Sequence, residues 1–181
     1  MVARLPYVME SGGVSPDLKS LYDEISRVQG SVLNLYRILG NQPPALRAFM
    51  TMSRYVRHQS SLRPQLRELA ILVTGTVLEV DYERVHHLAE ARKAGVPEPK
   101  LRDIPTWRTS TVYAPVERAV MAYADQVART RRVDDAVIAE LLLYLSPQQL
   151  IDLAITVGWY HLCAVLILPL GVELEEGLPK P

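Results

Sequence analysis

The chain has 181 residues, enough for one ordinary domain, and its 49% hydrophobic against 22% charged residues predict a packed core rather than a disordered chain. Lys plus Arg and Asp plus Glu both total 20, so the formal net charge is zero. That balance gives no electrostatic reason to expect a nucleic-acid or an anionic-membrane partner. The single cysteine, Cys163, cannot form an intrachain disulfide, which argues against a secreted, disulfide-stapled class.

In chain order, Leu, Ala, Arg and Glu recur at helical spacing, which predicts an all-α fold. We expect helices over 17–29, 32–40, 44–58, 64–78, 81–94, 116–130, 134–145 and 147–168, with a loop over 100–115. The predicted organisation is an irregular arm over 1–16, one domain of packed helical hairpins over 17–176, and a tail over 177–181.

The N-terminus lacks the apolar stretch of a signal peptide. The most apolar segment, Leu150 to Val172, carries Asp152, His161 and Pro169. A membrane span requires roughly 20 apolar residues without charges, so we interpret this segment as a buried helix. The sequence therefore predicts a soluble, cytoplasmic protein.

Two segments of the chain resemble each other. Residues 62–71 and 145–155 both begin a helix at a proline, and each segment is followed further along by Gly-Val, at Gly95-Val96 and Gly171-Val172. The pattern fits an internal duplication of a helical hairpin. Helix starts also look alike in unrelated helices, so both interpretations stay open.

The chemistry-bearing residues gather around one predicted hairpin. Glu83 and His87 are four residues apart, which puts them on one helix face within side-chain reach. Glu68 lies on the preceding helix, and a helical hairpin can bring it alongside them. Two carboxylates beside a histidine form a natural proton-transfer unit, because histidine titrates near neutrality. We predict Glu68, Glu83 and His87 as catalytic residues, with Tyr82, His86 and Arg84 lining a substrate pocket.

The same residues also allow purely structural interpretations. A Glu–His pair at this spacing is common on solvated helix faces, where it stabilises a helix by only a few tenths of a kcal/mol. Successive helix residues point about 100° apart, so His86 and His87 cannot chelate one ion together. His58 and His161 are too unconstrained to complete a metal site, and we expect no metal and no other cofactor.

Other familiar chemistry is absent from the sequence. It has no glycine-rich phosphate loop, no Gly-x-Ser-x-Gly and no Cys-x-x-Cys. Cys163 is interpreted as a small buried residue, and Trp159-Tyr160 is interpreted as core more readily than as a ligand wall. Arg63, Arg67 and Arg84 could bind a substrate carboxylate or simply pair with nearby acids.

Taken together, several segments resemble the carboxymuconolactone decarboxylase and AhpD-like family. The matching segments are 41–46, 62–71, 82–87, 91–96, 117–119, 158–160 and 171–173. The resemblance covers most of residues 32–176, and it lies in the order and spacing of the segments rather than in one strict motif.

The resemblance also identifies what this chain lacks. In the redox branch of the family, a glutamate precedes a Cys-x-x-Cys by twelve residues, and a histidine follows the second cysteine by four. Glu68 and His87 match, but the cysteine positions are Val80 and Glu83. Peroxide reduction by a dithiol requires one thiolate to attack and a second thiol to resolve the product. We therefore expect no thiol peroxidase activity, and a peroxiredoxin or alkylhydroperoxidase label would be a family name only.

The family resemblance implies an all-α fold of helical hairpins in homo-oligomers, trimers or hexamers, with the site near a subunit interface. The leading hypothesis is a decarboxylase-like lyase that performs cofactor-independent acid–base chemistry, decarboxylation or isomerisation, on a small lactone or cyclic oxo-acid. The alternative is a non-catalytic protein that binds small molecules or assembles on the same scaffold.

Overall fold

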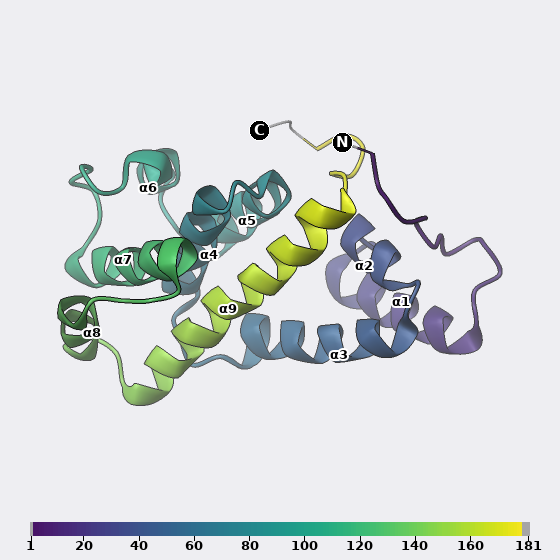
Figure 1. The fold of residues 1–181 in the computed structure, drawn as a ribbon, viewed down its shortest axis with the longest axis horizontal. Coiled ribbons are helices and arrows are strands. Elements are labelled where there is room, and N and C mark those ends of the chain that lie inside the picture. The colour runs from purple at the N-terminus through teal and green to yellow at the C-terminus, as the bar shows by residue number, and fades with distance from the viewer. Residues whose placement is uncertain (1, 179–181) are drawn as a thin grey trace. The chain divides into compact units, whose positions relative to one another are not determined.

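The structure is a computed structural model that describes residues 2–178. Within that stretch every regular element is a helix and no strand occurs, which confirms the predicted all-α fold (Figure 1). The described residues form two compact units, one from residues up to His58 with Leu166–Leu178, the other from Gln59–Val165. Residues 179–181 of the predicted tail lie outside the described part. The predicted domain boundaries at residues 17 and 176 stay a prediction.

The first unit consists mainly of three short helices. They are α1 (Pro16–Gln29), α2 (Asn34–Leu39) and α3 (Pro43–Arg54), followed by the π-helical turn η1 (Tyr55–Gln59). α1 begins where the Ser15 side chain accepts a hydrogen bond from the Leu18 N–H, and it ends at Gly30 with φ 86°. The helix predicted over 44–58 is therefore α3 plus a π-helical end.

Gly40 is fixed by a close approach in this unit. A Cβ atom at Gly40 would collide with the Tyr22 hydroxyl, which donates to the Val8 carbonyl at 2.9 Å. Burial of Tyr22, with the Glu10 charge nearby, raises the pKa of its phenol to about 12, so the hydroxyl stays a donor. Only glycine therefore fits at position 40 without displacing this bond.

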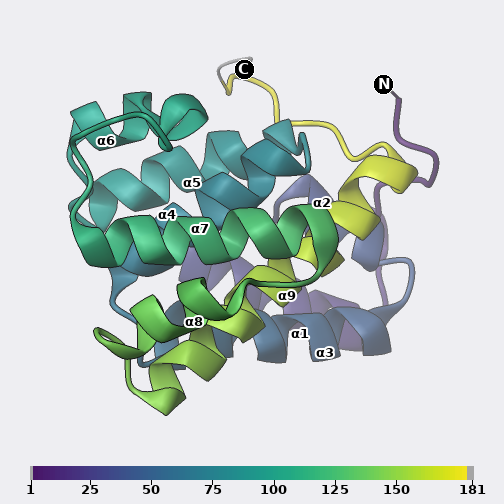
Figure 2. The ribbon, with the colours of Figure 1, turned by 60° about the vertical axis from the view of Figure 1, so that its left-hand side comes forward.

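The second unit is built around α4. Its elements are α4 (Pro64–Val77), α5 (Asp81–Lys93), α6 (Glu98–Arg102), the 3-10 turn η2 (Ile104–Thr106), α7 (Pro115–Thr130), α8 (Asp135–Leu142) and the part of α9 (Pro147–Leu170) up to Val165. α4 packs against both α5 and α7, and α7 also packs against α8 (Figure 2). α4 is accordingly buried at nearly every position from Leu66 to Gly75, which explains its apolar run from Leu69 to Val73.

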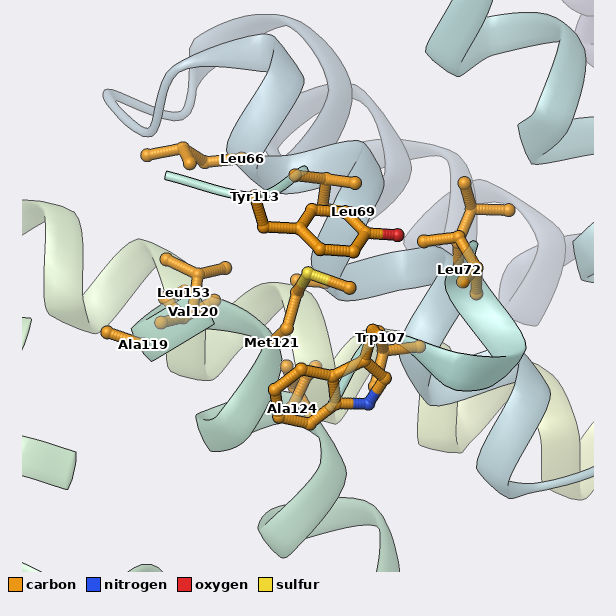
Figure 3. Packing of buried hydrophobic residues seen from close by; sticks show 14 of the residues in the cluster. Leu66, Leu69, Leu72, Trp107, Tyr113, Ala119, Val120, Met121, Ala124 and Leu153 are labelled. Carbon is orange, nitrogen blue, oxygen red and sulfur yellow. The ribbon is translucent and has the colours of Figure 1, made fainter. Parts of the chain in front are cut away.

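The core of this unit joins residues that are distant in sequence. Met121 of α7 lies among Leu69, Trp107 and Tyr113 (Figure 3), and all four belong to one buried cluster. Close packing of such side chains supplies most of the favourable free energy of folding, because the apolar area removed from water is large. The cluster holds α4 in place, and α4 carries Glu68.

The prediction of a loop over 100–115 was wrong in part. Residues 98–102 form α6 and residues 104–106 form η2, because a proline is tolerated in the first turn of each. The rest of the segment is fixed by Arg118, whose guanidinium donates to the carbonyls of Trp107, Arg108 and Ser110 at 2.7–3.2 Å. The segment is therefore an ordered wall of the unit.

α9 is long and apolar enough to cross a membrane by length and composition, and it is the one described helix that meets those criteria. Such a helix is weak evidence for a span, because core helices of soluble proteins pass the same test. Leu153, Val157 and Tyr160 of α9 are buried in the protein. The predicted helix is therefore present with one face packed, and its interpretation as a buried helix instead of a membrane span stays a prediction.

A matched pair of substitutions tests the core. Val120 is 0% exposed and Val112 is 38% exposed. Val120→Ala should lower the free energy of unfolding by about 2 kcal/mol, because it removes two buried carbons and leaves a cavity. Val112→Ala should change it by less than about 0.5 kcal/mol. Urea denaturation measures both, and equal losses would contradict this assignment of the core.

Candidate active site

The site lies on the hairpin formed by α4 and α5. α4 ends at Val77, and Glu79 adopts a left-handed conformation with φ 56° that reverses the chain. The Val80 N–H then donates to the Gly75 carbonyl at 2.8 Å, and α5 begins at Asp81. The turn therefore sets α5 against the second half of α4.

Two spacings bring the functional side chains together. Glu68 and Gly75 are seven residues apart, two helical turns, so they lie on the same face of α4. A Cβ atom at Gly75 would lie 3.7 Å from the Glu83 Cβ, so α5 approaches the α4 backbone closely at this point. His87 lies one helical turn after Glu83 on α5, so the two side chains share a face. The predicted meeting of Glu68, Glu83 and His87 is confirmed.

His87 is bound from both sides. Its Nδ1 lies 2.7 Å from Glu68 Oε2, and its Nε2 lies 2.8 Å from the Tyr160 hydroxyl. With Glu68 ionised, Nδ1–H donates to the carboxylate, and Nε2 of the neutral ring accepts from the phenol. The Tyr160 ring also packs edge-on against the imidazole, with centroids 4.8 Å apart. Hydrogen bonds and ring packing together fix the orientation of His87.

Glu83 supplies a second carboxylate at the same nitrogen. Its Oε2 lies 3.4 Å from His87 Nε2. If His87 gains a proton, Nε2–H faces both Glu83 and Tyr160, and either can share that hydrogen. The imidazole thus has one fixed partner at Nδ1 and two groups at Nε2, the nitrogen where its proton can change place.

The network is almost completely buried. Glu68 and His87 are each 4% exposed, Glu83 is 6% and Tyr160 is 4%. Burying charged groups costs several kcal/mol each unless partners compensate. Arg67 provides one partner, with its Nε 3.4 Å from Glu68 Oε1. In such a low-dielectric site, hydrogen bonds are electrostatically stronger than they are in water.

The arrangement is chemically a proton relay. A carboxylate that orients an imidazole through Nδ1, leaving Nε2 to exchange a proton with a hydroxyl, follows the logic of Asp–His–Ser triads. Here the hydroxyl belongs to Tyr160, and Glu83 stands beside the same nitrogen at 3.4 Å. The contacts therefore connect two carboxylates, an imidazole and a phenol along which a proton can move.

The other predicted pocket residues make contacts of their own. Tyr82 is buried and stacks on His86, with ring centroids 4.4 Å apart, and His86 Nδ1 lies 2.8 Å from the Tyr82 carbonyl oxygen. Arg84 pairs with Asp81 at 2.8 Å on the surface. Substrate binding by Tyr82, His86 and Arg84 stays a prediction.

Tyr160 is the relay member that the sequence did not identify. We interpreted Trp159-Tyr160 as core, and Tyr160 is indeed buried, but its hydroxyl binds His87 across 73 positions of sequence. A buried tyrosine requires a hydrogen-bond partner, and that requirement was the available signal. The next residue, His161, lies outside the relay. Burial, with the Arg131 charge nearby, lowers its pKa.

Comparisons with known proteins bear on the family and the fold of this chain. The sequence model of the Carboxymuconolactone decarboxylase family matches residues 43–126, which include α4, α5 and most of α7. This match, together with AhpD-like structural neighbours, supports membership of the carboxymuconolactone decarboxylase/AhpD-like family. The relay residues Glu68, Glu83 and His87 lie inside the matched segment, whereas Tyr160 lies outside it.

One curated relative and two solved structures place this family member among its neighbours. It is 24% identical over 122 residues to the uncharacterized protein YdfG of Bacillus subtilis (strain 168), covering 64% of this chain and 80% of that protein. An AhpD-core, peroxidase-related protein of Ralstonia eutropha JMP134 superposes with a TM-score of 0.84 at 18% identity, over 97% of this chain and 94% of that one. The debrominase Bmp8, solved with 2,3,4-tribromopyrrole, superposes with a TM-score of 0.82 at 17% identity, over 97% and 95%. At these identities the two structures establish the fold alone.

The Glu68–His87 bond can be tested through stability. Glu68→Leu leaves His87 Nδ1 and Arg67 without their buried acceptor and should cost about 3 kcal/mol of unfolding free energy. Glu68→Gln keeps an acceptor oxygen and should cost less than half as much. Glu90→Gln, which removes the partner of an exposed Lys93 pair, should leave the urea midpoint almost unchanged.

A double-mutant cycle separates this bond from general damage. Glu68→Leu combined with His87→Leu should cost less than the sum of the two single substitutions, by about 1–3 kcal/mol. Additive losses would contradict a direct interaction between the two side chains.

Proposed function

We propose that this family member is a cofactor-independent acid–base enzyme that decarboxylates or isomerises a small lactone or cyclic oxo-acid. The observation that carries the proposal is the buried Glu68–His87–Tyr160 relay with Glu83 at the same imidazole nitrogen. A purely structural contact between α4 and α5 would not require two buried carboxylates, because apolar side chains of similar volume stabilise a core at least as well.

Each group has a role in the proposal. In decarboxylation, the bond to the substrate carboxylate breaks, carbon dioxide leaves and the electron pair becomes an enolate. The Tyr160 hydroxyl donates to the enolate oxygen, as an oxyanion donor does. Protonated His87 returns a proton to carbon, Glu68 holds the imidazole by Nδ1, and Glu83 passes a replacement proton from solvent. In isomerisation the same groups remove and return a proton.

Dithiol peroxidase chemistry is not proposed for this chain. Val80 and Glu83 occupy the positions where the redox branch of the family carries its cysteines. Cys163 is buried on α9 and has no second cysteine to pair with in the sequence. A single thiol cannot complete the attack and resolution steps of that reaction.

The second candidate is a non-catalytic protein on the same scaffold. Both ring nitrogens of His87 have partners within 2.8 Å, and the group is 4% exposed, which also suits a brace between helices. Under this hypothesis the relay contributes to stability and no substrate reaches it.

Kinetics on a panel of small lactones and cyclic oxo-acids distinguishes the two candidates. For a substrate that turns over, His87→Ala should lower kcat/KM by about 10²–10⁴-fold. Tyr160→Phe should lower it by about 10²-fold, because one donor to the oxyanion is lost. Glu83→Gln should lower it as well. The exposed histidine variant His58→Ala should retain the wild-type rate.

Rates unchanged in both His87→Ala and Glu83→Gln would reject the assignment. Enzyme-dependent consumption of an alkyl hydroperoxide with a thiol reductant would overturn the exclusion of peroxidase chemistry.

We further propose that the protein is a cytoplasmic homo-oligomer, a trimer or hexamer, as the family resemblance implies. α9 supports this proposal with an exposed stripe at helical spacing, formed by Ile151, Ala154, Gly158, Leu162 and Val165. A contiguous exposed apolar stripe of this kind marks an interaction surface on soluble proteins.

A charge placed on the stripe tests the assembly. Sedimentation equilibrium of the wild-type protein should give a mass three or six times the 20.3 kDa mass of the chain. Val165→Glu should shift it to the monomer, because a carboxylate cannot be buried unpaired in an apolar interface. Val28→Glu changes a valine on α1 that is also more than half exposed, and it should leave the mass unchanged. A wild-type monomer would reject the proposal.

A further inference from the structure

A polar cavity lies away from the relay, at the end of α4. Its volume is about 180 Å³, and its wall combines Thr76 and Glu79 with Trp107, Arg108 and residues of α7. Neither Glu68, Glu83, His87 nor Tyr160 lines it. The cavity therefore belongs to a different part of the unit from the proposed active site.

Two arginines meet one buried carboxylate in this cavity. Asp125 of α7 accepts from Arg129 Nε at 3.2 Å and from an Arg108 terminal nitrogen, and its side chain is almost fully buried. The arginine side chains remain 53% and 54% exposed. One carboxylate carries a single negative charge, so the Arg108–Asp125–Arg129 cluster by itself has one net positive charge, which Glu79 elsewhere on the wall offsets.

The cluster is held before any ligand arrives. The Arg108 guanidinium lies over the Trp107 ring, 5.1 Å from its centroid. Arg118 fixes the backbone of the same segment through the Trp107 and Arg108 carbonyls. A preorganised guanidinium loses little conformational entropy on binding, which favours recognition of a planar anion.

The two arginines that line the cavity have more N–H groups than their bonds to Asp125 use. A guanidinium has five N–H groups, and the bonds to Asp125 occupy only some of those on Arg108 and Arg129. The remaining groups suit a second carboxylate, because the guanidinium fork matches carboxylate geometry. Apolar residues Val77, Ile104 and Pro105 complete the wall and can contact a compact hydrocarbon body.

We propose that this cavity binds a small organic monocarboxylate, with its carboxylate on Arg108 and Arg129 and its apolar body against Trp107. Glu79 lines the same cavity and adds a negative charge. That charge disfavours a ligand with a second anionic group, so Glu79 is the specificity determinant against dicarboxylates and phosphate.

Amide and indole NMR with sodium benzoate tests the site on the full chain at constant ionic strength. The two tryptophans give two indole N–H signals, and Trp107→Phe assigns the one in the cavity. Benzoate should shift the Trp107 signal saturably, with a Kd on the order of 1 mM for so small a ligand. Benzyl alcohol, which has the same ring without the carboxylate, should leave it in place.

Variants decide which groups bind. Arg108→Met and Arg129→Met each leave Asp125 one arginine partner, and each should weaken benzoate binding at least tenfold. Arg132→Gln, an exposed arginine outside the cavity wall, should bind as wild type does. Glu79→Gln should tighten benzoate binding several-fold and admit isophthalate.

Three results would overturn the proposal. The first is a chemical-shift change of the Trp107 indole signal that stays linear with benzoate concentration, up to 50-fold above the expected Kd. The second is benzoate binding by folded Arg108→Met and Arg129→Met that is as tight as binding by the wild-type protein. The third is tighter binding of inorganic phosphate than of benzoate, which would assign the cavity to an inorganic anion.

Discussion

The hydrogen bond between His87 Nδ1 and Glu68 is the interaction on which the site depends. At 2.7 Å it joins α4 to α5, and it decides which imidazole nitrogen faces Tyr160 and Glu83. Two backbone features make it achievable. The left-handed turn at Glu79 reverses the chain, and Gly75 lets α5 approach α4 closely. The buried cluster around Leu69 and Met121 then holds α4 in position. The relay is therefore a product of core packing as much as of the residues that form it.

Burial strengthens the interactions within the relay, and it also costs free energy because polar groups are removed from water. A carboxylate, an imidazole and a phenol removed from water interact strongly, but each must find a partner inside the protein. Here Arg67, Glu68, His87 and Tyr160 satisfy one another in a chain of contacts. Glu83 adds a carboxylate where the redox branch of the family carries its second cysteine, and under the proposed function this carboxylate takes part in proton transfer. The fold itself is shared with an AhpD-core, peroxidase-related protein and with a debrominase, so the fold alone does not assign the chemistry of this site.

Local spacing made part of this site predictable. Glu83 and His87 are one helical turn apart, and a proline-started helix that leads into a short turn predicts the neighbouring Glu68. The all-α fold and most helix bounds were also predictable, because apolar periodicity is a local property of the sequence. Tyr160 was not predictable as a relay member, because it meets His87 across 73 positions through the packing of α9. The Arg108–Asp125 pair was hidden similarly, since it crosses a segment interpreted as a loop whose order depends on Arg118.

The central claim is that the buried relay exchanges protons with a bound carbon acid. Proton NMR in D₂O tests it directly, by following loss of the signal from the carbon next to the carbonyl of a small lactone or cyclic oxo-acid. We expect protein-dependent exchange that disappears in His87→Ala and in Tyr160→Phe while both variants remain folded. Exchange at the buffer rate with the wild-type protein for every compound of these two classes would contradict the account and leave the relay as a structural brace between α4, α5 and α9.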